Sequence, residues 1–137
     1  MNQSPTKSYV PRPEWMILDW HHACIEAGAL CVQQCDQCGR WRNPPRRCCP
    51  DCFSDSFEFR PVAGTGSVRS LSVSHRSLDP GWNERAPYAV LLVELAEGPS
   101  VLAATDLDPA DIAIGQPIDL TIERRSDDFV LVWANPR

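Results

Sequence analysis

The spacing of apolar and polar positions changes along the chain, from a helical repeat near the N-terminus to an alternating repeat in the C-terminal half. Residues 14–27, EWMILDWHHACIEA, contain no Pro or Gly and place Trp15, Leu18 and Ile25 at helical spacing, with Gly28 next. This pattern predicts a helix that Gly28 ends. Either its apolar stripe packs on the rest of the chain, or a face made of Trp15, Met16, Ile17 and Trp20 docks a partner.

The C-terminal half predicts five strands joined by turns. The connector DLDPADIAIG, at residues 106–115, predicts one helical turn that starts at Asp108 and closes at Gly115. It stands between the third and fourth strands, which is the element order of a small OB barrel. The predicted strands are residues 66–75, 87–96, 100–105, 116–125 and 128–134.

Shorter segments stand before and after the predicted helix. Residues 1–13 are polar and hold three prolines, so we expect an irregular or partner-ordered arm. Residues 29–34 and 56–62 predict short extended segments on either side of a cysteine-rich stretch.

That stretch, CDQCGRWRNPPRRCCPDC, contains two CxxC motifs with ten residues between them. A structural zinc site takes four Cys or His ligands in a tetrahedron, and each CxxC supplies two thiolates from one tight turn. The spacing predicts a zinc ribbon that holds one structural zinc ion through Cys35, Cys38, Cys49 and Cys52.

The remaining cysteines are expected to lie outside this site. Cys48 would require a CxxxC pair, so Cys49 is the better ligand. Cys24 and Cys31 resemble small buried apolar residues. Four thiolates leave no open position for a catalytic water. The four arginines in the stretch, at positions 40, 42, 46 and 47, are positioned to balance the thiolate charge.

No complete catalytic constellation is visible elsewhere. The adjacent His21 and His22 point about 100° apart on a helix, so they cannot chelate one ion together. His75 has no identifiable nucleophile as a partner. We therefore expect a protein without its own active site.

Charge separates the two halves of the 137-residue chain, whose net charge is −5. Residues 1–76 carry nine Lys/Arg and seven Asp/Glu, whereas residues 77–137 carry four and eleven, a net of −7 that would repel a phosphate backbone. No apolar run approaches the ~20 residues that cross a bilayer, and no secretory signal is visible, so a cytoplasmic protein without membrane contact is expected.

The residues from the first CxxC onward resemble a known family. QQCDQCGRWRNPPRRCCPDCFSDSFEFRPVAGTGSVRSLSVSHR, followed by PYAVLLVELAEGPSVLAATDLDPADIAIGQPIDL, is similar to zinc-ribbon plus OB-fold proteins associated with acyl-CoA metabolism, long catalogued as a domain of unknown function. The resemblance covers roughly residues 20–134. Two features depart from the family pattern, namely the His21-His22 pair, where an aromatic pair is common, and Cys48.

The resemblance implies a mainly β protein made of an N-terminal helix, a rubredoxin-like zinc ribbon and a five-stranded OB-fold barrel. The expected units are an arm over residues 1–13, a helical segment over 14–32, a ribbon over 33–60 and a barrel over 61–137. The family implies an accessory subunit of a thiolase-like acyltransferase or aldolase, or of a MaoC-like hydratase, with the catalytic residues in the partner.

Two sets of side chains are candidates for intermolecular contacts. Arg46 and Arg47 are suited to the phosphates of coenzyme A at an interface shared with the partner, and Trp15, Trp20 and Trp41 are suited to the partner itself. The alternative is a nucleic-acid-binding module, since zinc ribbons and OB barrels both serve that role. The acidic barrel half and its few aromatic residues argue against that alternative.

Overall fold

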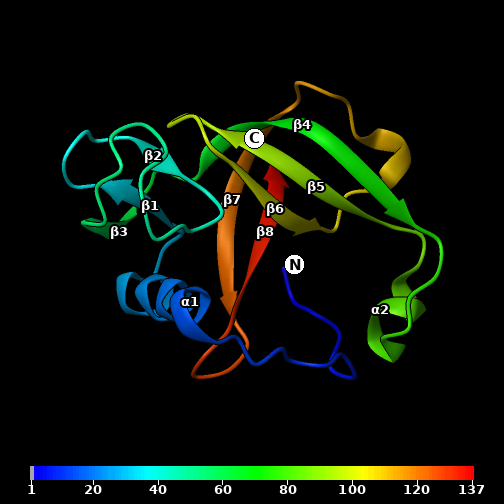
Figure 1. Cartoon of the computed structure of the whole chain (residues 1–137). Helices are drawn as coiled ribbons and strands as arrows, with labels where there is room; N and C mark the ends of the chain where they lie inside the picture. The colour runs from blue at the N-terminus through cyan, green and yellow to red at the C-terminus, as the bar shows by residue number, and fades with distance from the viewer. Residues whose placement is uncertain (1) are drawn as a thin grey trace.

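The computed structural model describes residues 2–137 as a helix, a small three-stranded sheet and a closed five-stranded barrel (Figure 1). The order is α1 (Trp15–Ala27), β1 (Cys31–Cys35), β2 (Trp41–Arg42), β3 (Phe57–Pro61), β4 (Thr65–Ser74), α2 (Pro80–Arg85), β5 (Tyr88–Leu95), β6 (Ser100–Thr105), a 3-10 turn (Pro109–Asp111), β7 (Pro117–Arg124) and β8 (Val130–Pro136). The predicted mainly β fold with an N-terminal helix is confirmed. Among the described residues, no helix is long and apolar enough to cross a membrane.

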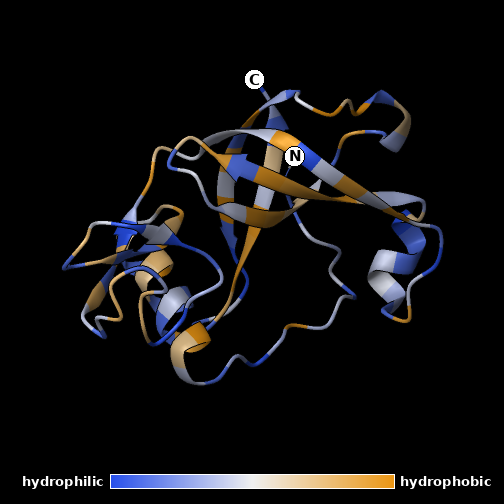
Figure 2. Ribbon diagram, turned by 45° about the horizontal axis from the view of Figure 1, so that its top comes forward, coloured by the Kyte–Doolittle hydropathy of each residue, from blue (hydrophilic) through white to orange (hydrophobic). Residues whose placement is uncertain are grey.

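The barrel closes in the strand order β4-β5-β6-β8-β7. All its pairings are antiparallel except β6 with β8, which is parallel and holds only two residue pairs. Its strands carry the hydrophobic stretches of the chain (Figure 2). Leu91, Val93, Val68 and Ile118 are at most 1% exposed in its interior.

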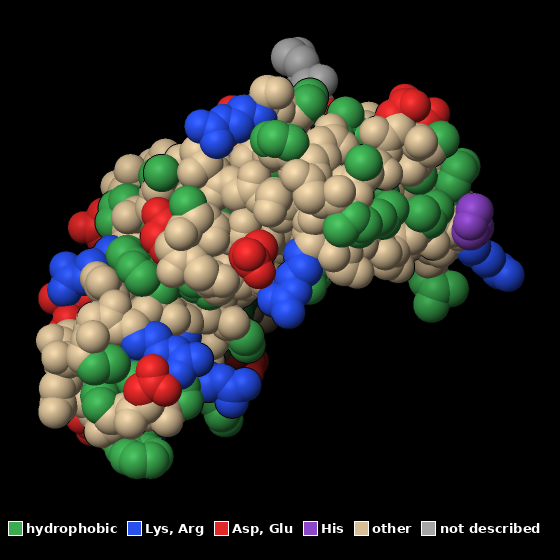
Figure 3. Space-filling view, turned by 90° about the horizontal axis from the view of Figure 1, so that it is seen from above, with side chains coloured by type: hydrophobic (Ala, Val, Ile, Leu, Met, Phe, Trp, Pro, Cys, Tyr) green, Lys and Arg blue, Asp and Glu red, His purple; other side chains and the backbone are tan. Residues whose placement is uncertain are grey.

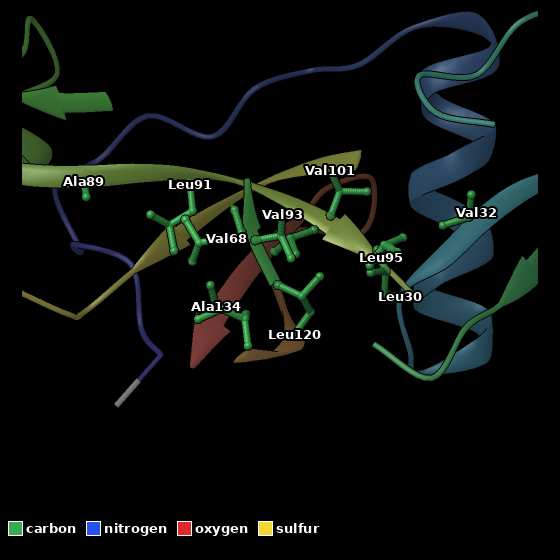
Figure 4. Packing of buried hydrophobic residues seen from close by; sticks show 13 residues of the cluster. Leu30, Val32, Val68, Ala89, Leu91, Val93, Leu95, Val101, Leu120 and Ala134 are labelled. Carbon is green, nitrogen blue, oxygen red and sulfur yellow. The ribbon is translucent and has the colours of Figure 1, made fainter. Parts of the chain in front are cut away.

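The ribbon sheet, in the order β2-β1-β3, joins the barrel core through the start of β1. Leu30 and Val32 belong to the same buried cluster as Leu95 at the end of β5 (Figure 4). Helix α1 ends at Gly28, whose φ of 63° is left-handed and confirms the predicted stop. The indole Nε1 of Trp20 donates to the carbonyl of Cys31 at 2.7 Å, so helix, ribbon and barrel pack as one body.

Over residues 2–13 the N-terminal arm has no helix or strand, and it is ordered by contacts with the chain's own barrel and the α2 region. Ser4 and Ser8 are buried, at 5% and 9% exposure. The Ser4 amide donates to both carboxylate oxygens of Glu123 on β7, and the Tyr9 amide donates to Asp79 ahead of α2. The arm therefore spans from α2 to the end of β7. Met1 lies outside the described residues.

Two short elements were not predicted. Helix α2 is capped at its N-terminus by Asp79, whose carboxylate accepts from the amides of Gly81 and Trp82. Its Gly81 packs so closely on the arm that a Cβ would lie 2.7 Å from the Cβ of Pro5. Strand β2 has two residues, paired with Gln33 and Gln34 of β1.

Candidate metal centre and the surface around it

Two knuckles of matching backbone geometry present the four predicted cysteines. In the first, the Gly39 amide donates to the Cys35 carbonyl at 3.0 Å and Gly39 has a φ of 77°. In the second, the Phe53 amide donates to the Cys49 carbonyl at 2.9 Å and Phe53 has a φ of 64°. The residue after each second cysteine is therefore left-handed. Glycine suits this conformation, and the exposed Phe53 adopts it under strain.

The four sulfur atoms of Cys35, Cys38, Cys49 and Cys52 all lie within 4.8 Å of one another. The Cys35–Cys52 and Cys38–Cys49 sulfur pairs are each 3.5 Å apart. A tetrahedral ion with Zn–S bonds of about 2.3 Å requires sulfur separations of about 3.8 Å. The donor set and its spacing thus fit one structural zinc ion. Within residues 2–137, no other group of three or more His, Cys, Asp or Glu side chains is placed to hold a metal.

Backbone amides favour the thiolate form of the first cysteine in each knuckle. The Cys38 amide donates to the Cys35 sulfur at 3.5 Å and lowers the pKa of that thiol to about 6. The Cys52 amide likewise lowers the pKa of Cys49. At Cys38 the Arg40 amide favours the thiolate, but the Cys49 sulfur, burial and the other two sulfur atoms together outweigh it and raise the pKa to about 12. A divalent cation among the sulfurs removes this competition for protons.

The other cysteines lie away from the cluster. Cys48 is exposed, and its sulfur is not among the four. Cys24 and Cys31 are buried, as predicted, and the Cys31 amide donates to the Cys24 sulfur at 3.3 Å. The side-chain hydrogen bond with the Cys31 thiol, followed by burial, raises the pKa of Cys24 and outweighs the opposite effect of the Cys31 amide, so this thiol stays protonated.

A buried polar network fixes the loop between the knuckles. The side-chain amide of Gln33 both accepts from the Arg46 amide and donates to the Arg46 carbonyl, each at 2.8 Å. The Arg42 guanidinium, in a residue only 5% exposed, donates to the same carbonyl at 3.0 Å and lies over the Phe57 ring. The backbone of the loop is therefore held while the side chains of Arg46 and Arg47 remain exposed.

A cleft of about 700 Å³ separates this loop from the barrel. Arg40, Trp41 and Arg46 line one side, and the β5–β6 turn at residues 97–99 lines the other. Arg40 is paired with Asp51. Basic side chains gather on the ribbon end of the molecule, with acidic ones among them (Figure 3). The sequence predicts a turn at residues 97–99 but not its place in this cleft, because nothing in its composition indicates that it faces the ribbon.

The remaining predicted contact residues lie on α1 and β2. Trp15 is 87% exposed, whereas Trp20 and Trp41 are half-buried against the core. The adjacent histidines hold α1 to the β7–β8 end of the barrel. The buried His21 Nδ1 accepts from the Val130 amide at 3.0 Å, and the exposed His22 lies 2.8 Å from Asp128.

Comparisons with known proteins match both parts of the chain. Residues 26–58 match the model of the ChsH2 rubredoxin-like zinc ribbon domain, and residues 59–123 match that of the ChsH2 C-terminal OB-fold domain. A DUF35 domain-containing scaffold protein of Methanothermobacter thermautotrophicus is 34% identical over 110 residues, which are 77% of this chain and 82% of the relative.

Two further similar proteins carry enzyme names. A probable enoyl-CoA hydratase alpha subunit of Thermomonospora curvata is 39% identical over 92 residues, and the match takes in 66% of this chain but only 28% of that subunit. Among solved structures, a chain of the Ltp2-ChsH2(DUF35) aldolase superposes with a TM-score of 0.80 at 32% identity, covering 93% of this chain and 98% of that one.

Proposed function

The chain belongs to the DUF35 family of zinc-ribbon and OB-fold proteins, and we propose that it is a non-catalytic subunit of an acyl-CoA-processing enzyme. The partner would be a thiolase-like acyltransferase or aldolase, or a MaoC-like hydratase. The observation that carries this proposal is the match of 93% of the chain to a chain of the Ltp2-ChsH2(DUF35) aldolase, whose name includes a second component, Ltp2.

The side chains of this molecule support an accessory role. The four clustered thiolates would complete the coordination of the zinc ion, so the metal would stiffen the ribbon without offering a position to substrate. Both histidines of α1 are engaged in contacts with the barrel end. The proposal therefore places the reacting groups in the partner.

Arg46 and Arg47 are proposed to contact the phosphates of coenzyme A in the assembled complex. Both side chains are exposed, and the network of Gln33 and Arg42 holds the backbone that carries them. Guanidinium groups on a fixed loop lose little freedom when they bind a phosphate. Trp41 lines the cleft together with Arg46, and Trp15, Trp20 and Trp41 are proposed to contact the partner polypeptide.

The nucleic-acid alternative lacks comparable support. OB-fold binders use the face of their second and third strands between two flanking loops. Here the arginines of those loops are engaged by the arm, because Arg85 donates to the Gln3 carbonyl and Arg125 donates to the Ser8 hydroxyl. The barrel half is also acidic, with a net charge of −7 over residues 77–137.

Assembly is tested by co-expression with a candidate thiolase-, aldolase- or hydratase-like subunit from the same genome. We expect one complex in size-exclusion chromatography with light scattering at micromolar concentration. Separate elution of the two proteins would contradict the proposal.

The coenzyme A contact is tested in the assembled enzyme with the double variant Arg46→Ala and Arg47→Ala. We expect the KM for acyl-CoA to rise about tenfold with kcat unchanged, as for lost binding shared by ground and transition states. Arg69→Ala, at an exposed arginine of β4, is the matched control. An unchanged KM in the double variant would refute this contact.

A further inference from the structure

An uncharged apolar groove crosses the outer face of β5, β6 and β8, and neither the metal centre nor the cleft accounts for it. Two cavities form it, one of about 510 Å³ between α1 and the barrel and one of about 270 Å³ beside α2. Both are lined by Leu102, which is 66% exposed. Ile17 and Trp20 stand at one end of the groove, and Trp82 and Tyr88 at the other.

The groove exists because β6 and β8 diverge. They pair only at Ala104 with Trp133 and at Thr105 with Ala134, so the earlier residues of both strands have no ladder between them. The ribbon and α1 occupy the far end of this gap. Asn43 donates to the Ser100 carbonyl at 2.9 Å, and His21 accepts the Val130 amide. Between these two contacts and Trp82, the gap is lined mainly by apolar side chains.

The absence of charged side chains from the groove limits which molecules can bind there. None of the described residues that line either cavity is Lys, Arg, Asp or Glu, although the barrel half carries a net charge of −7. A charged or phosphate-bearing occupant would lose its hydration without gaining a partner there. An apolar, uncharged occupant would lose nothing and would remove Leu102 from water.

The shape of the groove favours a polypeptide over a small molecule. Small-ligand sites bury 70–90% of the ligand in an enclosed pocket, whereas Leu102 here projects between two separate cavities and stays two-thirds exposed. Two neighbouring pockets around a projecting leucine suit two side chains of a partner, as at the anchor residues of protein interfaces.

We infer that this groove is the surface on which an uncharged, apolar segment of the partner enzyme docks, with its side chains in the two cavities beside Leu102. The inference rests on the proposed function, because it takes the partner to be the acyl-CoA-processing subunit. It adds a contact surface for the partner that is separate from the coenzyme A contact proposed at Arg46 and Arg47 on the ribbon loop.

The test measures the Kd of the enzyme subunit for the full-length chain by isothermal titration calorimetry. Leu102→Asp is expected to weaken binding at least about tenfold, the loss typical of an anchor residue. Ile114→Asp is the matched control, since Ile114 is 64% exposed and lines neither cavity. We expect that control to stay within about twofold of the unsubstituted chain. Equal affinities for the two variants would overturn the inference and leave the proposed function standing, whereas no binding by the unsubstituted chain would overturn both.

A second measurement does not depend on how Leu102→Asp folds. The photo-crosslinking residue benzoylphenylalanine, placed at position 102, is expected to form a covalent adduct with the enzyme subunit, and the same residue at position 114 is not. No adduct from position 102 would overturn the inference. The isolated chain is also titrated with decanoyl-CoA and with coenzyme A. Tighter binding of decanoyl-CoA that Leu102→Asp abolishes would assign the groove to an acyl chain and overturn the inference.

Discussion

Replacing Glu123 by Ala tests whether the N-terminal arm is part of the folded barrel. The Glu123 carboxylate accepts from the Ser4 amide at 3.1 Å to each oxygen and from the Ser4 hydroxyl at 3.2 Å. It also accepts from the indole Nε1 of Trp133 at 3.0 Å. Ser4 is 5% exposed and Trp133 is fully buried, so the substitution leaves two N–H donors without an acceptor in places that water reaches poorly, while the Ser4 hydroxyl can rotate to another partner.

The cost follows from these two donors. A buried donor without a partner destabilises a protein by about 1–3 kcal/mol. For two such donors the summed cost is about 2–6 kcal/mol. Because the arm can move and admit water, we expect the free energy of unfolding to fall by about 3 kcal/mol, in the lower half of that range. With a urea dependence of about 2 kcal/mol per molar, the unfolding midpoint would fall by about 1.5 M.

Urea unfolding, monitored by circular dichroism, measures this shift in the midpoint. Two further variants serve as comparisons. Glu123→Gln keeps one acceptor oxygen, so about half of the loss is expected. Glu94→Ala removes an exposed glutamate of β5, whose oxygen lies 3.6 Å from Arg69. That control should cost less than about 1 kcal/mol, as exposed ion pairs do. If Glu123→Ala shifts the midpoint no further than Glu94→Ala, the arm does not contribute to stability.

Three further predictions concern the ribbon and helix α1. Protein purified without added metal is expected to contain about one equivalent of zinc, and chelation should unfold the ribbon; Cys49→Ser should lose the metal while Cys48→Ser retains it, and retention by Cys49→Ser would contradict the ligand assignment. Phe53→Gly should raise the free energy of unfolding by up to about 1 kcal/mol in thermal denaturation, because the left-handed backbone of Phe53 suits glycine; a lower stability would show that the Phe53 ring is needed. Burial, and then His22, lowers the pKa of His21 below 6.5. As the pH falls through about 6.5, the unfolded chain therefore binds a proton that the folded chain excludes, and stability decreases; His21→Asn keeps an acceptor without a titrating group, so an unchanged pH slope in that variant would refute this role.

Much of the architecture was predictable because local patterns decide it. The alternation of β7 and the apolar run of β5 are set by which positions face the barrel interior, and that spacing is visible in sequence. The two CxxC motifs carry their own turn geometry, so the ribbon was predictable from a few residues. Gly28 marks the end of α1 for the same local reason.

The elements that were not predicted depend on distant contacts. Strand β2 exists because the first knuckle returns the chain beside β1, and two residues cannot show a period. The arm was expected to be irregular, but its partner Glu123 lies 119 residues from Ser4. No local pattern joins such positions. The cleft between the ribbon loop and the turn at residues 97–99, and the groove at Leu102, are likewise assembled from separate parts of the chain.

The metal centre and the groove are connected through named contacts. The first knuckle holds the end of β1 and the start of the loop that carries Asn43, and Asn43 donates to β6 at Ser100. Strand β1 also accepts, at the Cys31 carbonyl, the hydrogen bond from Trp20 of α1. The neighbouring His21 of α1 accepts from the Val130 amide of β8. Both diverging strands are therefore braced by parts that the ribbon supports. If the groove is the docking surface, zinc would act on partner binding by keeping β6 and β8 apart, and loss of binding after chelation would be a mechanical consequence of the unfolded ribbon.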